Sequence, residues 1–199
     1  MSRLRKLLFM EEHTCPWWFG YTFDNPLRPL VHPPEHVLGG LVQEGETVAD
    51  IGCGGGHFTL GLAGLVGTGG RVVAVDLQKK MLARARARAE RLGLDGAIDF
   101  RPCEQDHLGL KETLDFVLAF WMVHEVSDQK RFFSEILLAL KPSGRLLVAE
   151  PKVHVTASRF QSTLGVARES GFTVSSRPRV RFSRAVILSP ISSLNAPAA

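Results

Sequence analysis

Residues 48–57 read Val48-Ala49-Asp50-Ile51-Gly52-Cys53-Gly54-Gly55-Gly56-His57. An apolar run that ends in an acid and then in closely spaced glycines is typical of a buried strand followed by a tight turn into a helix. A second apolar run, residues 71–76, also ends in an acid, Asp76. Two acids at the ends of neighbouring parallel strands predict a nucleoside-binding crevice at the carboxyl edge of an α/β sheet.

The spacing of the glycines narrows the choice of nucleoside. Gly52 and Gly54 fit the first two places of the dinucleotide fingerprint G-x-G-x-x-G, but His57 stands at the third. Gly56 produces the pattern G-x-G-x-G instead. The lysine of a phosphate-binding loop is absent, and we expect no Lys or Arg near this loop. The pattern therefore disfavours NAD-linked oxidoreduction and nucleoside triphosphates.

Composition favours one globular domain. The chain has 199 residues, of which 45% are hydrophobic, and a net charge of +4 that is spread along the sequence rather than gathered in blocks. Its three Cys are widely spaced, which favours a reducing compartment over a disulfide framework. No run approaches the roughly 18 apolar residues that cross a bilayer, nor a signal-peptide core. We therefore expect a soluble, cytoplasmic protein.

Three segments are expected along the chain. Residues 1–45 form an aromatic and proline-rich leader over the site, residues 46–188 form the domain, and residues 189–199 form a small, polar tail that we expect to be disordered. Within the leader, Pro33 and Pro34 predict a helix start.

Strand and helix patterns alternate through the domain, which predicts an α/β fold with a mostly parallel sheet. Strands are expected at residues 47–52, 71–76, 97–101, 114–120, 145–149, 173–182 and 185–188. Helices are expected at residues 57–66, 79–92, 128–140 and 158–170, with Asp128 as an N-cap, Gly93 at a C-terminus, and Pro142 and Gly144 as terminators. The short connection between the last two strands predicts a hairpin, so the final strand runs antiparallel.

This order of elements resembles the class I S-adenosylmethionine-dependent methyltransferases. It is most similar to the type 11 branch, which includes ubiquinone and menaquinone biosynthesis C-methyltransferases and arsenite methyltransferases. The similarity covers about residues 35–188 and is carried by four segments: Asp50-x-Gly52-x-Gly54-x-Gly56, Val75-Asp76-Leu77, residues 114–120, and residues 140–150, which read LKPSGRLLVAE. It implies a Rossmann-like, seven-stranded, mostly parallel sheet with an antiparallel last strand and helices on both faces.

The resemblance implies S-adenosylmethionine as the cofactor and S-adenosylhomocysteine as the product. The site residues that it implies are Gly52, Cys53, Gly54 and Gly56 at the methionine end, Asp50 at the loop and the amino group, Asp76 at the ribose, Leu77 at the adenine, and Phe120 beside the transferred methyl. One segment departs from the type 11 pattern, because Pro102-Cys103-Glu104 replaces the usual Gly-Asp-Ala after the third strand. Glu104 is the carboxylate closest in sequence that can accept from the adenine amine.

His124 is the candidate general base, since a histidine near the acceptor can take a proton at neutral pH. The alternative is a histidine at a helix start with no chemical role, because methyl transfer depends mainly on placement and water exclusion. Trp17, Trp18, Tyr21 and Trp121 are the candidate walls of the acceptor pocket. The aromatic residues of the leader have an alternative role, as anchors of the leader on the sheet.

Other patterns carry weaker hypotheses. His13 and Cys15 provide only two ligands, so no metal site is expected. Cys15 and Cys103 leave an arsenite acceptor open as a minor alternative. Two groups of arginines are expected on solvated faces, where RNA contact is the competing interpretation: Arg84, Arg88 and Arg91 on one helix, and Arg177, Arg179 and Arg181 along the sixth strand.

The sequence thus predicts a methyltransferase that acts on a small-molecule acceptor, with nucleic acid an improbable partner. Two alternatives stay open. One is a methyltransferase of RNA or protein, which salt-dependent binding of RNA would favour. The other is a protein that binds S-adenosylmethionine without turnover.

Overall fold

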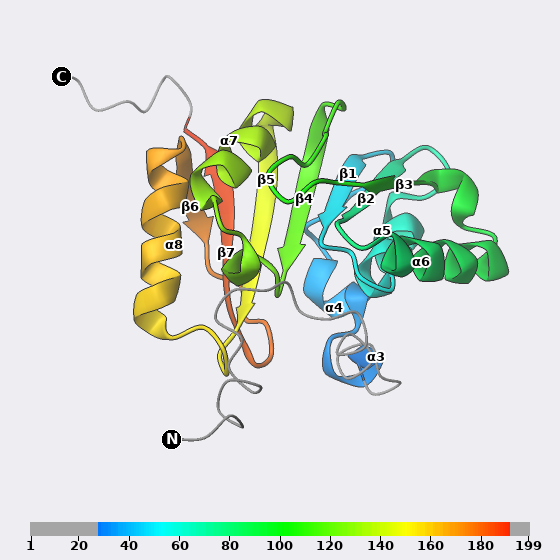
Figure 1. The fold of residues 1–199 in the computed structure, drawn as a ribbon. Helices are drawn as coiled ribbons and strands as arrows, with labels where there is room; N and C mark the ends of the chain where they lie inside the picture. Colours follow the sequence, from blue (N-terminus) through cyan, green and yellow to red (C-terminus); the bar gives the residue numbers. More distant parts are fainter. Residues whose placement is uncertain (1–27, 192–199) are drawn as a thin grey trace.

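The computed structural model describes residues 28–191, and Figure 1 shows how its elements are arranged. The strands of residues 28–191 are β1 (Thr47–Ile51), β2 (Arg71–Asp76), β3 (Ile98–Pro102), β4 (Leu114–Phe120), β5 (Leu140–Pro151), β6 (Phe172–Ser176) and β7 (Ser183–Pro190). Their helices are α3 (Arg28–Val31), α4 (Pro34–Leu38), α5 (His57–Val66), α6 (Lys79–Leu92), α7 (Gln129–Ala139) and α8 (Ala157–Glu169). Two short 3₁₀ helices lie between these elements: η1 (Asp95–Ala97) between α6 and β3, and η2 (Val123–Glu125) between β4 and α7.

The strands form one seven-stranded sheet in the order β3-β2-β1-β4-β5-β7-β6. Pairing is parallel from β3 to β5, whereas β7 runs antiparallel to both β5 and β6. This arrangement confirms the expected fold class. The chain winds outward in opposite directions from β1 and β4, and the carboxyl ends of two such strands are where ligands bind in open α/β sheets.

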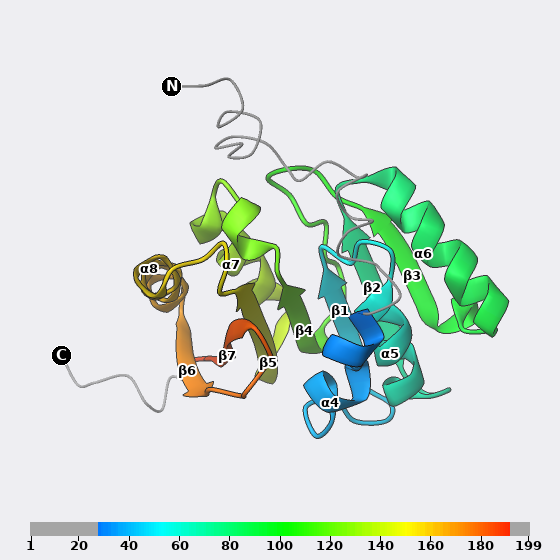
Figure 2. The same cartoon turned by 90° about the horizontal axis from the view of Figure 1, so that it is seen from below.

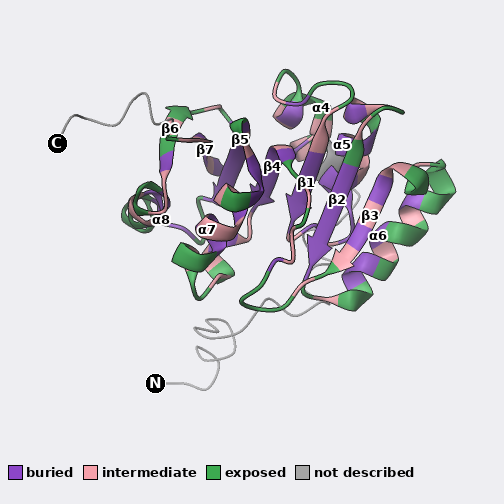
Figure 3. Ribbon diagram, turned by 90° about the horizontal axis from the view of Figure 1, so that it is seen from above, coloured by how far each residue is buried: buried purple, intermediate pink, exposed green. Residues whose placement is uncertain are grey.

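Helices cover both faces of the sheet. On one face, α4, α5 and α6 contribute Leu38, Leu62 and Ala85 to a buried apolar cluster. On the other face, α7 and α8 contribute Phe133 and Leu164 to a second cluster. Figure 2 shows α7 on the opposite side of the strands from α4 and α5, and Figure 3 shows that the central strands between them are buried. The near-continuous apolar runs of β2 and β4 follow from this double coverage.

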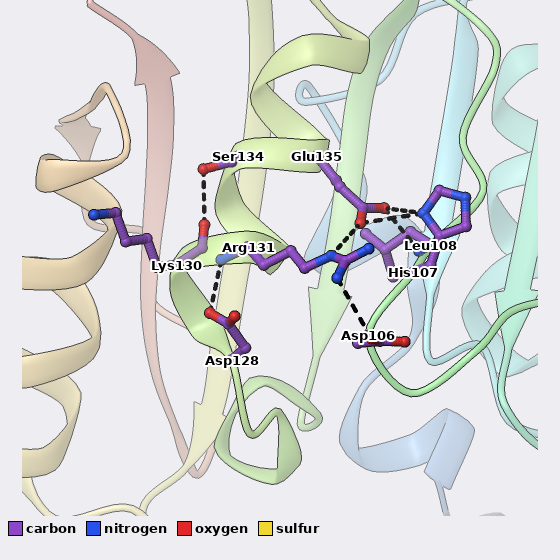
Figure 4. Close-up of polar contacts among 8 residues, drawn as sticks. All are labelled: Asp106, His107, Leu108, Asp128, Lys130, Arg131, Ser134 and Glu135. Carbon is purple, nitrogen blue, oxygen red and sulfur yellow. Dashed lines mark hydrogen bonds and ion pairs between the residues drawn. The ribbon is translucent and has the colours of Figure 1, made fainter.

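A loop, residues 103–113, covers part of the second face. Its Leu108 is buried in the same cluster as α7. The Glu135 carboxylate of α7 accepts a 2.8 Å hydrogen bond from the Leu108 N–H and lies 3.2 Å from His107 Nδ1. Figure 4 shows these contacts beside the ion pair between Arg131 and Asp106. The long β3–β4 connection is therefore tied across the sheet to α7.

Local signals for helix ends are confirmed. Pro34 is the first residue of α4, and Gly93 ends α6 with a φ of 66°. Asp128 caps α7 through a 2.9 Å hydrogen bond from the Arg131 N–H (Figure 4). These contacts depend only on neighbouring residues, which is why the sequence predicts them well.

The fifth strand is longer than expected. It begins at Leu140 rather than at residue 145, so Pro142 and Gly144 lie within it instead of ending a helix before a turn. Leu114 pairs with Leu140 and Phe116 with Arg145, and this shift in register absorbs the extra residues as a bulge. The helix therefore passes directly into the strand.

The sixth strand is shorter than expected. It ends at Ser176, so the prediction that Arg177, Arg179 and Arg181 share one face of a strand was wrong. Pro178 cannot donate to a ladder, and Phe182 at φ 56° turns the chain into β7. The three arginines are exposed on the loop at the carboxyl edge of the sheet.

The ends of the chain bear on the expected segments. The last strand continues to Pro190, so the expectation that residues 189 and 190 are disordered was wrong. Trp17, Trp18, Tyr21, His13 and Cys15 all lie outside the described residues, as do residues 192–199. No helix within residues 28–191 is long and apolar enough to cross a bilayer.

Candidate functional site

The glycine loop between β1 and α5 adopts backbone conformations that favour glycine. Gly52, Gly54 and Gly56 have φ values of 70°, 53° and 84°. A Cβ at Gly52 would lie 2.9 Å from the Met122 Cγ, and one at Gly56 would lie 2.8 Å from the Ala85 Cβ. No atom lies within 4 Å of the corresponding position at Gly54. Gly52 and Gly56 thus permit close packing of the loop, whereas Gly54 leaves open space at its surface.

Asp76, at the end of β2, holds the glycine loop. Its Oδ2 accepts from the Gly54 N–H at 2.8 Å, and its Oδ1 accepts from the Gln78 N–H at 2.8 Å. The residue is 8% exposed. Burial raises the pKa of the carboxyl group, and the two hydrogen bonds oppose that shift. Asp76 therefore presents a partly desolvated acceptor beside the open space at Gly54.

Asp50 connects the end of β1 to α5. Its Oδ2 accepts a 2.6 Å hydrogen bond from the Thr59 hydroxyl, and the residue is only 2% exposed. The expected role in shaping the loop agrees with this contact, because the bond joins the strand to the helix on either side of the glycines. Its expected contact with the amino group of the cofactor stays a prediction.

A cation lies beside the loop, contrary to expectation. Arg88 Nη1 donates a 2.7 Å hydrogen bond to the Gly55 carbonyl oxygen. The helix α6 packs under the loop at Ala85, so the residue three positions further along faces the loop as well. The prediction that no Lys or Arg approaches the loop was wrong, and Arg88 holds the loop instead of lying on a purely solvated face.

The adenine side is partly as expected. Leu77 is 39% exposed directly after Asp76, so an apolar surface is available there. Glu104 is exposed in a turn that its backbone closes with His107 through bonds of 3.0 and 3.3 Å. Cys103, whose N–H donates to the Asp76 carbonyl oxygen at 3.2 Å, lies directly against the end of β2. The adenine contact of Glu104 stays a prediction.

These residues fit S-adenosylmethionine. The open space at Gly54 and the acceptor oxygens of Asp76 suit a ribose, while Leu77 suits an adenine face. Carboxylates at Asp50 and Asp76 suit a cationic sulfonium better than a phosphate. Arg88 donates a hydrogen bond to the Gly55 carbonyl oxygen, so it stabilises the loop.

Phe120, the last residue of β4, and Trp121, directly after it, lie in an aromatic cluster. Phe120 is buried, with its ring centroid 4.4 Å from that of Phe58 and 5.4 Å from that of Trp121. Trp121 has a φ of 61°, and its Nε1–H donates to the Ser183 Oγ at 2.8 Å. Cluster and hydrogen bond hold both rings in place at the carboxyl edge. Their predicted roles beside the methyl group and in the acceptor pocket stay predictions.

The segment before β1 is tied to this edge by histidines. His57 Nε2 lies 2.8 Å from the His32 carbonyl oxygen, and His32 Nε2 lies 2.7 Å from the Arg181 carbonyl oxygen. The ring of His32 also meets that of Trp121 edge-on at 5.0 Å. A buried, bonded side chain at His57 replaces the third glycine of a dinucleotide loop, which agrees with the preference against NAD.

His124 lies in η2, past the end of β4. The Nδ1 atom of His124 is 2.5 Å from Oε2 of Glu150, which is the second-last residue of β5, and 17% of the His124 side chain is exposed. His124 thus contacts a buried carboxylate, and its role as a general base stays a prediction. His124 and Glu150 are brought together by strand pairing, since Phe120 and Ala149 are partners in the register.

The two described cysteines are free thiols. Burial, followed by the charges of Asp50 and Asp76, raises the pKa of the Cys53 thiol. Burial and the charge of Asp76 raise the pKa of the Cys103 thiol to about 11. Both shifts disfavour the thiolate forms of these two side chains. Within residues 28–191, no three His, Cys, Asp or Glu side chains gather as a metal site requires.

Sequence reasoning assigned no role at this site to Thr59, Arg88, Met122 or Glu150. The position of Glu150, an acid at the end of the strand after the one that leads to His124, was a usable signal. The other three give no such signal, because each acts through a contact between separate elements. Thr59 and Arg88 donate hydrogen bonds, and Met122 packs on Gly52.

Comparison with known proteins agrees with this geometry. Residues 42–170 match the family model of the methyltransferase domain. The ubiquinone/menaquinone biosynthesis C-methyltransferase UbiE of Haemophilus ducreyi is 33% identical over 110 residues, which are 55% of this chain and 42% of that protein. UbiE of Klebsiella pneumoniae is 31% identical over 110 residues, with 55% and 44% covered. The chain thus spans less than half the length of these curated relatives.

Solved structures share the fold. A SAM-dependent methyltransferase from Aquifex aeolicus superimposes with a TM-score of 0.79 at 25% identity, covering 90% of this chain and 100% of the other. Aeropyrum pernix fibrillarin, solved with natively bound S-adenosyl-L-methionine, has a TM-score of 0.59 at 14% identity over 74% and 67% of the two chains, which shows a shared fold. This chain belongs to the methyltransferase domain family, and it is similar to class I S-adenosylmethionine-dependent methyltransferases, the UbiE proteins of the type 11 branch among them.

Proposed function

We propose that this chain transfers a methyl group from S-adenosylmethionine to a small-molecule acceptor. The observation that carries the proposal is the adjacency of two sets of residues at one edge of the sheet. Asp76 and the open position at Gly54 suit the cofactor, and Met122 joins this loop to the segment that holds His124. When bound, the cofactor supplies a methyl group on a sulfonium sulfur. The chain's part is to place the acceptor in line with that group and to exclude water.

Two observations support a small acceptor. The relatives that match over 110 residues are named as C-methyltransferases of ubiquinone and menaquinone biosynthesis. Residues 28–191 form one sheet with its covering helices, and within that range no separate unit stands beside the site to recognise a macromolecule. The aromatic rings of Phe120 and Trp121 at this edge suit a flat, apolar compound.

We place the reaction in the cytoplasm, where thiols such as Cys53 and Cys103 stay reduced. Catalytic assistance by His124 belongs to this proposal, because a histidine can take up the proton that an acceptor loses.

Calorimetry with S-adenosylmethionine, S-adenosylhomocysteine and NAD tests the cofactor first, with Asp76→Ala in parallel. We expect micromolar binding of both adenosyl ligands by the wild type, no binding of NAD, and loss of binding in the variant. The acceptor is tested next. The release of S-adenosylhomocysteine is measured with small phenols and, for comparison, with RNA. Binding of NAD alone, or turnover with RNA alone, contradicts the proposal.

A further inference from the structure

Glu150 is a buried carboxylate with both oxygens engaged. It is 1% exposed at the end of β5. Its Oε1 accepts a 2.9 Å hydrogen bond from the Val123 N–H, and its Oε2 lies 2.5 Å from His124 Nδ1. The backbone donor fixes the orientation of the carboxylate, so only Oε2 is directed at the histidine ring. A carboxylate that is buried to this extent needs such hydrogen-bond partners, because burying an unpaired charge costs free energy.

Other charged or titratable groups face His124 from neighbouring elements. Glu125 Oε1, in the same turn, is 4.0 Å from His124 Nε2. The ring of His154, in the β5–α8 connection, lies parallel to the His124 ring with centroids 6.2 Å apart. Arg159 Nη2, in α8, donates to the His124 carbonyl oxygen at 3.0 Å. Of these contacts, only that of Glu150 engages Nδ1 of the ring.

We propose that Glu150 is a positioning residue that makes His124 a general base acting through Nε2. This inference rests on the proposed function. A carboxylate only accepts hydrogen bonds, so Nδ1 must carry the hydrogen in the neutral ring, and the lone pair is on Nε2. Met122, two residues before the histidine, contacts the glycine loop at Gly52, so the base lies close to the cofactor side of the site.

The pair of His124 and Glu150, called the dyad below, defines a class of acceptor. An acceptor oxygen gives its proton to Nε2 and its electron pair to the methyl carbon, and the pair of the broken carbon–sulfur bond stays on sulfur. A phenol or an enol loses such a proton, as does a ring carbon that is methylated. A thioether or a tertiary amine has no proton to lose. The His124–Glu150 pair therefore suits acceptors that lose a proton on methylation, such as phenols and enols.

The substitution Glu150→Gln tests the dyad without any acceptor. The amide oxygen would stay on the Val123 N–H, because only an oxygen can accept there, so the amide NH₂ would face His124 Nδ1. His124 Nδ1 must then accept a hydrogen bond from this NH₂ group. The hydrogen of the neutral ring therefore moves to Nε2. NMR of the full chain labelled with ¹⁵N-histidine, titrated until the ring is neutral, reports which nitrogen carries the hydrogen.

We expect the Nδ1–H form in the wild type and the Nε2–H form in Glu150→Gln. The matched control is Glu125→Gln, which changes the neighbouring carboxylate near Nε2 and should leave the Nδ1–H form in place. The Nε2–H form in the wild type, or the same tautomer in the wild type and Glu150→Gln, would overturn the proposal. Calorimetry with S-adenosylmethionine checks that each variant is folded, since the affinity should change less than about twofold.

Activity gives the second readout. Release of S-adenosylhomocysteine is measured with catechol and other phenols, and with dimethyl sulfide as the acceptor that has no proton to lose. We expect turnover only of the phenols, and a loss of about 100-fold or more in kcat for Glu150→Gln, the contribution typical of a general base. Turnover of dimethyl sulfide alone, or an unchanged kcat in the variant, overturns the inference. If the wild type releases no S-adenosylhomocysteine with any acceptor, the proposed function is contradicted. The proposal about Glu150 is then still tested by the tautomer of His124.

Discussion

The glycine loop and the β4–β5 edge lie side by side but are built differently. At the glycine loop, the backbone makes the site: Gly52, Gly54 and Gly56 have positive φ, and Asp76 accepts a main-chain N–H. At the β4–β5 edge, side chains make it, because His124 and Glu150 meet through their ring and carboxylate.

This difference explains why one region was easier to predict than the other. A backbone conformation requires particular residue types within a few positions, so it leaves a motif. A contact between side chains on two strands requires only that the strands pair, and many sequences satisfy that. The four predictions that follow test the contrast, from the largest expected effect to the smallest.

The glycine loop should be intolerant of a single methyl group at Gly56. Gly56→Ala combines a positive φ with a Cβ 2.8 Å from that of Ala85, and should lower the free energy of unfolding by about 3 kcal/mol. Gly64→Ala is the control, because it lies in α5 with no atom within 4 Å of the new Cβ. The control should be neutral or stabilising by up to about 1 kcal/mol. Urea denaturation measures both, and equal effects would show that the loop backbone is not restrictive.

The carboxylate of Asp76 should matter more to cofactor binding than to the fold. Asp76→Asn removes the charge and one of the two acceptor oxygens, so the affinity for S-adenosylmethionine should fall about 10- to 30-fold, which is about 1.4–2 kcal/mol. Asp95→Asn, at an exposed acid in η1, is the control and should bind like the wild type. Calorimetry compares them. An unchanged affinity in Asp76→Asn would remove the ribose contact from the proposed site.

Acid should lower the free energy of unfolding through Glu112, in the connection between β3 and β4. Two hydrogen-bonded contacts from Arg101, at 2.7 and 3.0 Å, lower the pKa of Glu112 from 4.5 to about 2. Because the folded pKa lies below the unfolded one, the pair stabilises the fold above pH 4.5, and this contribution is lost as the pH falls toward 2. After allowance for solvent screening, about 1–2 kcal/mol should be lost.

Glu112→Gln should remove that part of the pH dependence. Chemical denaturation of the wild type and the variant between pH 7 and about pH 3 gives the two curves, which should converge in acid. Parallel curves at every pH would show that the ion pair does not contribute to stability.

The β4–β5 edge should respond more weakly to the loss of one contact. Trp121→Phe keeps an aromatic ring beside Phe120 but removes the hydrogen bond to Ser183, so the free energy of unfolding should fall by about 1 kcal/mol. Ser183→Ala removes the other partner. In the double variant the two effects should not add, because both remove one interaction. Full additivity would mean that the hydrogen bond has no energetic role.

Much of the fold followed from local patterns. The bounds of β2, β4, α5 and α6 agree with the predicted ranges, since apolar periodicity and end signals such as Gly93 and Asp128 act over a few residues. The errors lie where pairing with a distant strand decides the outcome. The bulge opposite Leu114 lengthens β5, and Pro178 with Phe182 shortens β6.

The sequence by itself determined the fold class, the glycine loop and the acid of β2, because each depends on residue types at short, characteristic spacing. Only the tertiary structure decided that Arg88 holds the loop, that Met122 packs on Gly52, and that Glu150 engages His124. These contacts join residues from separate elements. Their geometry follows from helix packing and strand register, which no local pattern in the chain encodes.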